Sequence, residues 1–193
     1  MQAFLMHVGH PGHIDIPFTI TRRRSINELR HALSDTAPER NFFDADRSFL
    51  SAFPGGEFNC WGIPPKAEPA FEETRIGDLV LFAPWIGVHD GGIHQIGIVK
   101  AKFPDAAYQA SGILWPDTPF ERRFPWLLFF DTEVGRRDWY DFLDDVGYSE
   151  RWNPRGWYRR ISGDRFGNWG GPTGYLKFLR SDCGFRPLST PLV

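Results

Sequence analysis

The sequence predicts a mixed α+β chain in which strands and shaped loops outweigh helices. Aromatic residues make up 16% of the 193 residues, and the 20 glycines and 16 prolines imply many turns. Short apolar runs bounded by turn residues recur along the chain, as is typical of strands. Few segments carry apolar residues at helical spacing. These features disfavour a bundle of long helices.

Strands are expected wherever an apolar run follows or precedes a turn signal. The run at 3–8 (AFLMHV) is closed by glycine and proline, and the run at 79–82 (LVLF) follows a Gly-Asp turn. Asp-Gly-Gly at 90–92 leads into 93–99, a hairpin-like arrangement. The segment 126–130 (WLLFF) is apolar throughout, which predicts a strand buried on both faces.

Two helices have local signals. Ser25 and Glu28 form an S-x-x-E capping box ahead of apolar residues on one stripe, which predicts a helix over about 26–34. Apolar residues at helical spacing predict another over about 137–146. The stretch 163–174 is rich in glycine and without a period, so we expect an ordered but adaptable loop there.

Composition and length bound the class of protein. With 41% hydrophobic and 24% charged residues, the chain is globular, not disordered, collagen-like or coiled-coil. We expect one domain over 1–193, in which 151–193 is a basic, glycine-rich C-terminal extension. The sequence lacks the run of about 18 apolar residues that a membrane helix needs. Its start also lacks the layout of a signal peptide, so a cytoplasmic location without a membrane partner is expected.

No metal or other cofactor is expected. Cys60 and Cys183 are too few for a disulfide framework and lack zinc-site spacing. His7, His10 and His13 recur at intervals of three, but the glycines and proline between them break any helix that would align them.

Charge is unevenly distributed along the chain. The formal balance is −1 over 1–65, −7 over 66–150 and +6 over 151–193. A local basic cluster suits a polyanion such as a nucleic-acid backbone, whereas the alternative is a solvated basic tail. The candidate backbone contacts of the final segment interleave with aromatic residues: they are Arg151, Arg155, Arg159 and Arg160.

Two alternatives to a phosphate role stay open for these arginines. The arginines of the final segment could instead stack on the tryptophans of their own segment. A second basic cluster before the first helix consists of Arg22, Arg23 and Arg24, and it either contacts a second phosphate track or remains solvated. Arg22 and Arg23 are its candidate backbone contacts.

Five motifs, in order, resemble a known family. They are F-N-C-W-G-I-P at 58–64, I-G-D-L-V-L-F at 76–82, G-G-I-H-Q-I-G-I-V at 91–99, G-I-L-W-P at 112–116 and F-P-W-L-L-F-F at 124–130. This succession resembles the EVE and YTH branch of the PUA-like superfamily. The resemblance covers 58–131 well, the first strand loosely and the last 45 residues not at all.

The resemblance implies a PUA-like (EVE/YTH-type) partly open β-barrel flanked by helices, which holds one modified or flipped-out base in an aromatic cage. By motif, Trp61 and Trp115 correspond to cage tryptophans, and Phe120 to a further ring. Asn59 and Cys60 would contact the base edge. Such domains stand at the N-terminus of bacterial modification-dependent restriction endonucleases.

The free energies of base flipping and aromatic stacking support a site in which aromatic side chains enclose the base. Lifting a base from its stack costs a few kcal/mol, and aromatic stacking restores about 1 to 3 kcal/mol per base. A buried methyl group adds only about 0.8 kcal/mol, so the pocket must be snug for methylation to decide binding. Against this stands the ordinary role of tryptophan in core packing, which at least half of the eight must have.

The resulting hypothesis is a reader that binds a modified base in double-stranded DNA by base flipping, without chemistry and with no catalytic residue. It would be the specificity module of a restriction system, with a nuclease domain fused after Val193. The alternatives are a small ASCH-like hydrolase acting on modified nucleosides and an RNA-binding YTH/PUA-like module. The sequence leaves the modification open among N6-methyladenine, 5-methylcytosine and 5-hydroxymethylcytosine.

Overall fold

The structure is a computed structural model that describes residues 1–8, 16–33, 37–84, 91–119, 123–154 and 157–188. The chain divides into two compact units, each built from segments distant in sequence. Unit 1 comprises Met1–His13, Gly77–Ile98 and Thr132–Val193, and unit 2 comprises Ile14–Ile76 and Val99–Asp131. The single domain expected from the sequence stays a prediction.

The strands form one mixed sheet of eight, in the order β2-β3-β6-β5-β4-β1-β7, with β8 pairing with β6. The pairing of β1 with β4 is parallel, whereas β1 with β7, β3 with β6 and β4 with β5 are antiparallel. In the described part of the chain the two outer strands, β2 and β7, do not pair with each other, so the sheet is not closed into a barrel. The strands are β1 (Ala3–Val8), β2 (Arg24–Ser25), β3 (Glu57–Ile63), β4 (Leu79–Pro84), β5 (Gly92–Pro104), β6 (Trp126–Asp138), β7 (Tyr158–Ile161) and β8 (Arg186–Pro187).

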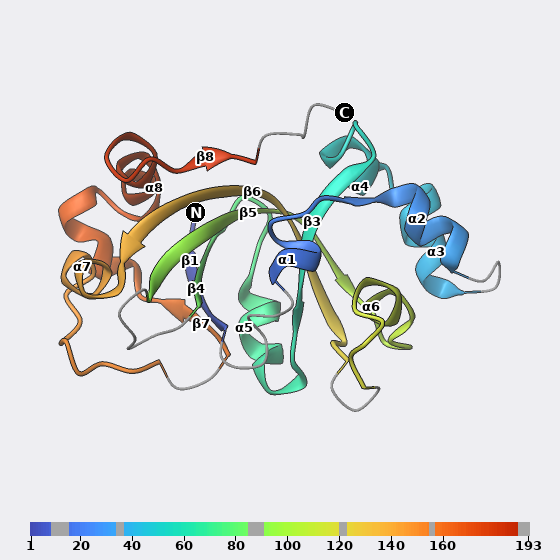
Figure 1. Ribbon diagram of the computed structural model, residues 1–193, viewed down its shortest axis with the longest axis horizontal. Helices are drawn as coiled ribbons and strands as arrows, with labels where there is room; N and C mark the ends of the chain where they lie inside the picture. Colours follow the sequence, from blue (N-terminus) through green and yellow to red (C-terminus); the bar gives the residue numbers. More distant parts are fainter. Residues whose placement is uncertain (9–15, 34–36, 85–90, 120–122, 155–156, 189–193) are drawn as a thin grey trace. The chain divides into compact units, whose positions relative to one another are not determined.

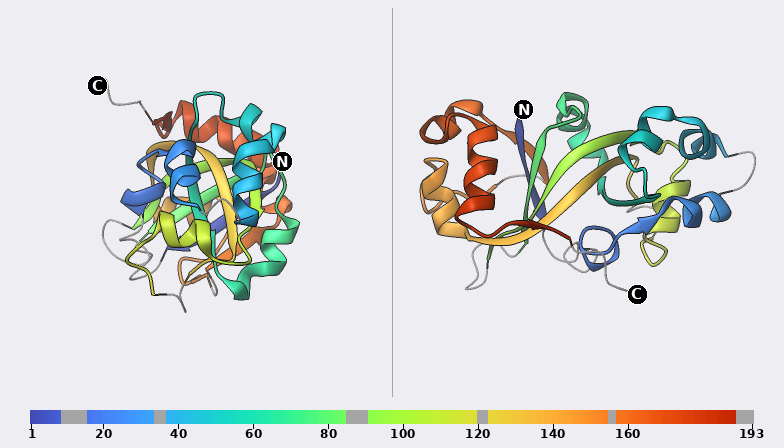
Figure 2. Two further views of the ribbon diagram at one scale, coloured as in Figure 1. Left: turned by 90° about the vertical axis from the view of Figure 1, so that its right-hand side faces the viewer. Right: turned by 90° about the horizontal axis from the view of Figure 1, so that it is seen from above.

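The helices are short and connect the strands (Figure 1). Figure 2 shows the two longest strands, β5 and β6, running side by side. No helix in the described ranges has the length and apolar character needed to cross a bilayer. The helices are α1 (Ile16–Thr19), α2 (Ile26–Ala32), α3 (Pro38–Ala45), α4 (Arg47–Ala52), η2 (Pro65–Ala67), α5 (Glu68–Glu73), α6 (Gln109–Leu114), α7 (Trp139–Asp145), η4 (Gly163–Trp169) and α8 (Pro172–Ser181).

Most elements with a local sequence signal are confirmed. Strands β1, β4, β5 and β6 cover the four apolar runs, and α2 and α7 cover the two predicted helices. The capping box at the start of α2 forms as expected: the Ser25 hydroxyl accepts a hydrogen bond from the Asn27 amide, and the Glu28 carboxylate accepts one from the Ser25 amide.

The prediction of a loop at 163–174 is wrong, because this stretch folds into η4 and the start of α8. The glycines that suggested a loop have local roles. Gly170 and Gly171 adopt positive φ angles and turn the chain between the two helices, and Pro172 begins α8. At Gly174 a Cβ would lie 1.6 Å from the carbonyl oxygen of Trp169, so only glycine permits this approach.

The core of unit 1 lies between one face of the sheet and helices α7 and α8. Buried residues of β1 and β4, such as Leu5 and Leu81, pack in the same cluster as Phe142, Tyr175 and Leu179. The segment 151–193 supplies β7, η4, α8 and β8 to this unit. Several of its apolar residues, such as Phe166, Tyr175 and Leu179, are therefore part of a core, while its described arginines Arg151 and Arg160 are exposed.

The core of unit 2 is built from phenylalanines that pack edge to face. Phe49 of α4 lies 5.3 Å from Phe43 of α3 and 5.0 Å from Phe129 of β6, measured between ring centroids. The T-shaped arrangement is the one that aromatic quadrupoles favour. This cluster also contains Cys60 of β3 and Trp115 at the end of α6, which brings two predicted site residues into the core of unit 2.

Candidate nucleic-acid interface

The two predicted cage tryptophans are neighbours in unit 2. Trp61 lies on β3 and Trp115 follows α6, and their ring centroids are 6.4 Å apart at an interplanar angle of 80°. Trp61 is 5% exposed and Trp115 is 3% exposed. The pair is thus an edge-to-face contact within the interior, whereas the expected cage needs two facing planes with a slot between them.

A third ring packs against Trp115. The ring centroids of Phe124 and Trp115 are 5.2 Å apart, and the two ring planes meet at 74°. The Phe124 ring also packs directly against Gly62 of β3. A Cβ on Gly62 would lie 2.1 Å from Cγ of Phe124, so the glycine makes room for that ring. Trp61, Gly62 and Phe124 together fix the orientation of Trp115.

Asn59 is an interior anchor. Its side chain is 3% exposed, and its amide nitrogen lies 3.2, 3.0 and 3.1 Å from the carbonyl oxygens of Thr19, Ile20 and Arg22. The amide nitrogen is therefore occupied by the segment that follows α1. Asn59 holds that segment in place, rather than presenting its amide nitrogen at the surface as expected for a contact with a base edge.

Cys60 is fully buried beside Phe129 in the pairing of β3 with β6. Burial raises the pKa of its thiol well above the usual range, so the group stays neutral. Its side chain does not reach the surface in this structure.

A shallow recess adjoins Trp115 on the surface of unit 2. Its volume is about 20 Å³, enough for roughly one water molecule and too small for a whole base. Phe18 beside it is 42% exposed, which is unusual among the phenylalanines that the structure describes. The lining residues are Phe18, Trp115, Pro116, Asp117 and Thr118.

Both walls of the recess are tied to the rest of unit 2. On one side, Asn59 anchors the segment immediately after Phe18. On the other, the Arg24 guanidinium donates a hydrogen bond to the carbonyl of Leu114, and the Thr118 amide donates one to the carbonyl of Trp115. The sequence pattern gave no signal for Phe18, because one exposed ring on a four-residue helix has no periodicity.

Two predicted site residues, Phe120 and Arg155, lie outside the described residues. The other five arginines that were predicted to contact the nucleic-acid backbone lie within the described residues. In unit 2, Arg22 is exposed, and Arg23 lies 3.8 Å from Glu57 in an exposed ion pair. In unit 1, Arg151 and Arg160 are exposed, and the Arg159 guanidinium lies 5.6 Å from the ring centroid of Trp152. That last contact matches the alternative in which an arginine stacks on a tryptophan of its own segment.

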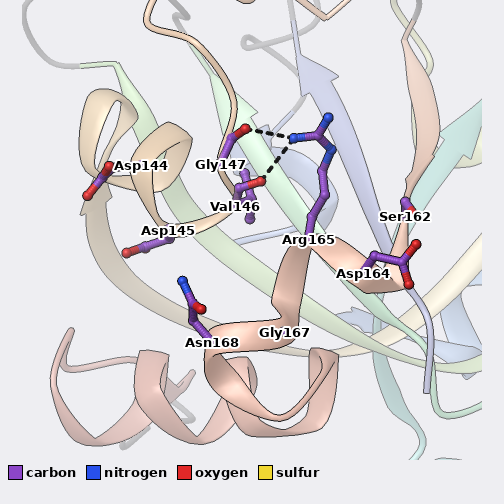
Figure 3. A pocket seen from close by; sticks show the side chains of 9 residues that line it. All are labelled: Asp144, Asp145, Val146, Gly147, Ser162, Asp164, Arg165, Gly167 and Asn168. Atoms are coloured by element: carbon purple, nitrogen blue, oxygen red, sulfur yellow. Dashed lines mark hydrogen bonds between the residues drawn. The ribbon is translucent and has the colours of Figure 1, made fainter.

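A larger cavity of about 460 Å³ lies in unit 1 between the end of α7 and η4 (Figure 3). The Arg165 guanidinium donates hydrogen bonds to the carbonyls of Val146 and Gly147. Asp144 and Asp164 place exposed carboxylates in the lining. Such a lining disfavours a phosphate, because the acidic groups repel it and the one guanidinium is already occupied.

Grouped metal ligands are absent from the described residues: no three His, Cys, Asp or Glu side chains come together there. Of the three histidines that invited a metal interpretation, only His7 is described. Its ring is partly buried on β1, which lowers its pKa.

Comparison with known proteins is informative for solved structures. No family model matches the sequence, and no curated protein matches it significantly. Among solved structures, the N-terminal domain of Thermococcus gammatolerans McrB bound to m5C DNA superposes with a TM-score of 0.61. The match covers 93% of this chain and 98% of that one, at 17% identity. The chain has the fold of that McrB domain.

The McrB-like fold confirms the fold class expected from the sequence, α+β and PUA-like with flanking helices, in the form of an open sheet. At this identity the likeness establishes architecture alone.

Proposed function

We propose that this chain binds DNA that carries a modified base, and that it recognises the base without changing it chemically. The observation that carries the proposal is the likeness of almost the whole chain to a McrB domain whose structure was solved bound to m5C DNA. In this proposal the domain is the specificity module of a modification-dependent restriction system, and a nuclease domain in the same assembly would cut the DNA.

The recess beside Trp115 is our candidate for the base-reading site. The base, flipped out of the duplex, stacks on the exposed ring of Phe18, and its substituent enters the recess. Stacking of this kind contributes about 1 to 3 kcal/mol per base, which offsets most of the cost of flipping. Trp61 supports Trp115 from the interior, so this arrangement retains both predicted tryptophans but assigns them different roles.

Basic residues next to the recess supply phosphate contacts in this proposal. Arg22 and Arg23 lie four and five residues beyond Phe18, on the segment that Asn59 anchors. Both guanidinium groups are exposed, and an arginine can donate two hydrogen bonds to one phosphate. In unit 1, the exposed Arg151 stays in the proposal. Arg159 and Arg160 are weaker candidates, because Trp152 engages the Arg159 guanidinium and the Arg160 guanidinium donates a hydrogen bond to the side chain of Gln2.

The test compares binding to short duplexes of one sequence that differ only in one base, measured by fluorescence anisotropy. We expect tighter binding to a duplex with a modified cytosine or N6-methyladenine than to the plain duplex. Equal affinity for all of these duplexes would overturn the proposal, as would preferential binding to single-stranded RNA or turnover of a modified nucleoside.

A matched pair of variants tests the site. Phe18→Ala should reduce the preference for modified DNA about tenfold, because one stacking surface is lost. Tyr140→Ala removes the ring of another exposed aromatic residue, on α7 in unit 1, and should leave the preference unchanged. If both variants behave like the wild type, the base is read elsewhere.

A further inference from the structure

The recess beside Trp115 is lined by a residue with an unpaired hydrogen-bond donor. The indole Nε1 of Trp115 is buried and has no acceptor among the described residues. An indole N–H can only donate. A buried polar group without a partner destabilises a protein, and most such groups in native structures are paired. This donor is therefore suited to an acceptor that the protein itself does not supply.

Size and composition restrict what could provide that acceptor. The recess holds about one water-sized group. Its lining adds an exposed carboxylate from Asp117 and a hydroxyl from Thr118. The described part of the chain offers no hydrogen-bond or ion-pair partner for the Asp117 carboxylate. The recess thus offers one donor, the indole N–H of Trp115, and two acceptors, the Asp117 carboxylate and the Thr118 hydroxyl. A hydroxyl group is small enough for the recess and can both accept and donate a hydrogen bond.

We propose that the recess selects a base whose substituent ends in a hydroxyl group, and that 5-hydroxymethylcytosine is therefore preferred to 5-methylcytosine. This inference rests on the proposed function, since it requires the substituent of a bound base to enter the recess. The hydroxyl oxygen accepts a hydrogen bond from Nε1 of Trp115, and the hydroxyl proton is donated to Asp117 or Thr118.

A methyl group fits the same space but makes neither hydrogen bond. The indole N–H of Trp115 therefore stays without a partner when the methyl base is bound, whereas a hydroxyl supplies one. Sites that bond a hydroxyl reject an analogue without it far more strongly than an apolar pocket rejects an extra group. Given the usual cost of one unpaired buried donor, the preference for the hydroxymethyl base should be about tenfold or more.

The experiment uses three duplexes of identical sequence with cytosine, 5-methylcytosine or 5-hydroxymethylcytosine at one position. Trp115→Phe keeps an aromatic ring and removes the N–H. Trp126→Phe is the matched control, because Nε1 of Trp126 is also buried and unpaired in unit 2 but lies away from the recess. Thermal melts of both variants report whether they fold.

The wild type and Trp126→Phe should bind the hydroxymethyl duplex about tenfold more tightly than the methyl duplex. Trp115→Phe should lose this preference, so that it binds the hydroxymethyl and methyl duplexes with the same affinity. Should Trp115→Phe fail to fold, Asp117→Ala at the exposed edge takes its place and should reduce the preference severalfold.

The outcomes separate the inference from the function on which it rests. Equal or tighter binding of the methyl duplex by the wild type overturns the inference and leaves the proposed function standing. A hydroxymethyl preference that survives in Trp115→Phe, or in Asp117→Ala where that variant is used, also overturns it. Binding of all three duplexes with one affinity overturns the inference, and a fourth duplex with N6-methyladenine then tests the proposed function, which equal affinity for that duplex as well would overturn.

Discussion

The side-chain amide of Asn59 on β3 lies 3.0 Å from the carbonyl oxygen of Ile20, just beyond α1. Two further carbonyls, of Thr19 and Arg22, lie within 3.2 Å of the same nitrogen. One buried side chain thus fixes the backbone between the exposed Phe18 ring and the exposed arginines. The proposed DNA contact depends on this anchor, although Asn59 itself does not reach the surface.

Asn59→Ala should lower the free energy of unfolding by about 2 to 3 kcal/mol, since it leaves buried carbonyls without a donor. Asn59→Asp should be more destabilising, because a carboxylate of the same size faces the carbonyls with acceptors only. Urea denaturation measures both. Asn168→Ala, at an exposed asparagine of η4, is the control and should change stability little. If both Asn59 variants were as stable as the control, the hydrogen bonds of the Asn59 side chain would contribute nothing to the free energy of unfolding.

Gly62→Ala should disturb the support of Trp115. The new Cβ would come within 2.1 Å of Phe124, and that ring would have to leave its contact with Trp115. We expect a loss of about 1 to 3 kcal/mol in stability, the usual range for overpacking, and weaker binding of modified DNA. Gly55→Ala is the control, because a Cβ there meets nothing within 4 Å. Equal melting temperatures for the two variants would contradict the packing argument.

The buried carboxyl of Asp105 should make stability depend on pH. It accepts hydrogen bonds from the amides of Ala110 and Ser111 at the start of α6, but burial dominates and raises its pKa above the ordinary value of 3.8. The folded protein therefore holds this proton more tightly than the unfolded chain does. The stabilisation is complete below pH 3.8 and is lost as the pH rises through the raised value.

Asp105→Asn should remove this dependence. The measurement is the difference in unfolding free energy between wild type and variant, by urea denaturation from pH 4 to pH 7. We expect the wild type to lose stability relative to the variant as the pH rises. A difference that is constant over this range would mean that the Asp105 carboxyl titrates alike in the folded and unfolded chain.

Arg22→Ala should weaken binding to all duplexes alike and reduce the slope of log affinity against log salt by about one, as expected for one lost phosphate contact. Arg47→Ala removes an equally exposed arginine of α4 that the proposal does not use, so its slope should match the wild type. Titrations at several salt concentrations give the slopes. An unchanged slope for Arg22→Ala would mean that Arg22 does not contact a phosphate of the DNA.

Local chemistry was sufficient for the elements whose signals lie within a few residues. The capping box of Ser25 and Glu28 predicted α2, and the apolar run at 126–130 predicted the buried start of β6, because capping and burial depend on nearby residues. The stretch 163–174 was misread as a loop. There the glycines permit a tight turn and a close approach between η4 and α8, contacts that composition does not reveal.

For the candidate site, the sequence indicated an aromatic pair and basic clusters, and Trp61 and Trp115 are indeed neighbours. It did not indicate how they face each other, that Asn59 and Cys60 lie inside, or that Phe18 is exposed. Residue type limits what a side chain can donate, accept or stack on. Exposure and ring orientation depend on which distant segments pack around that side chain, and only the folded chain brings those segments together.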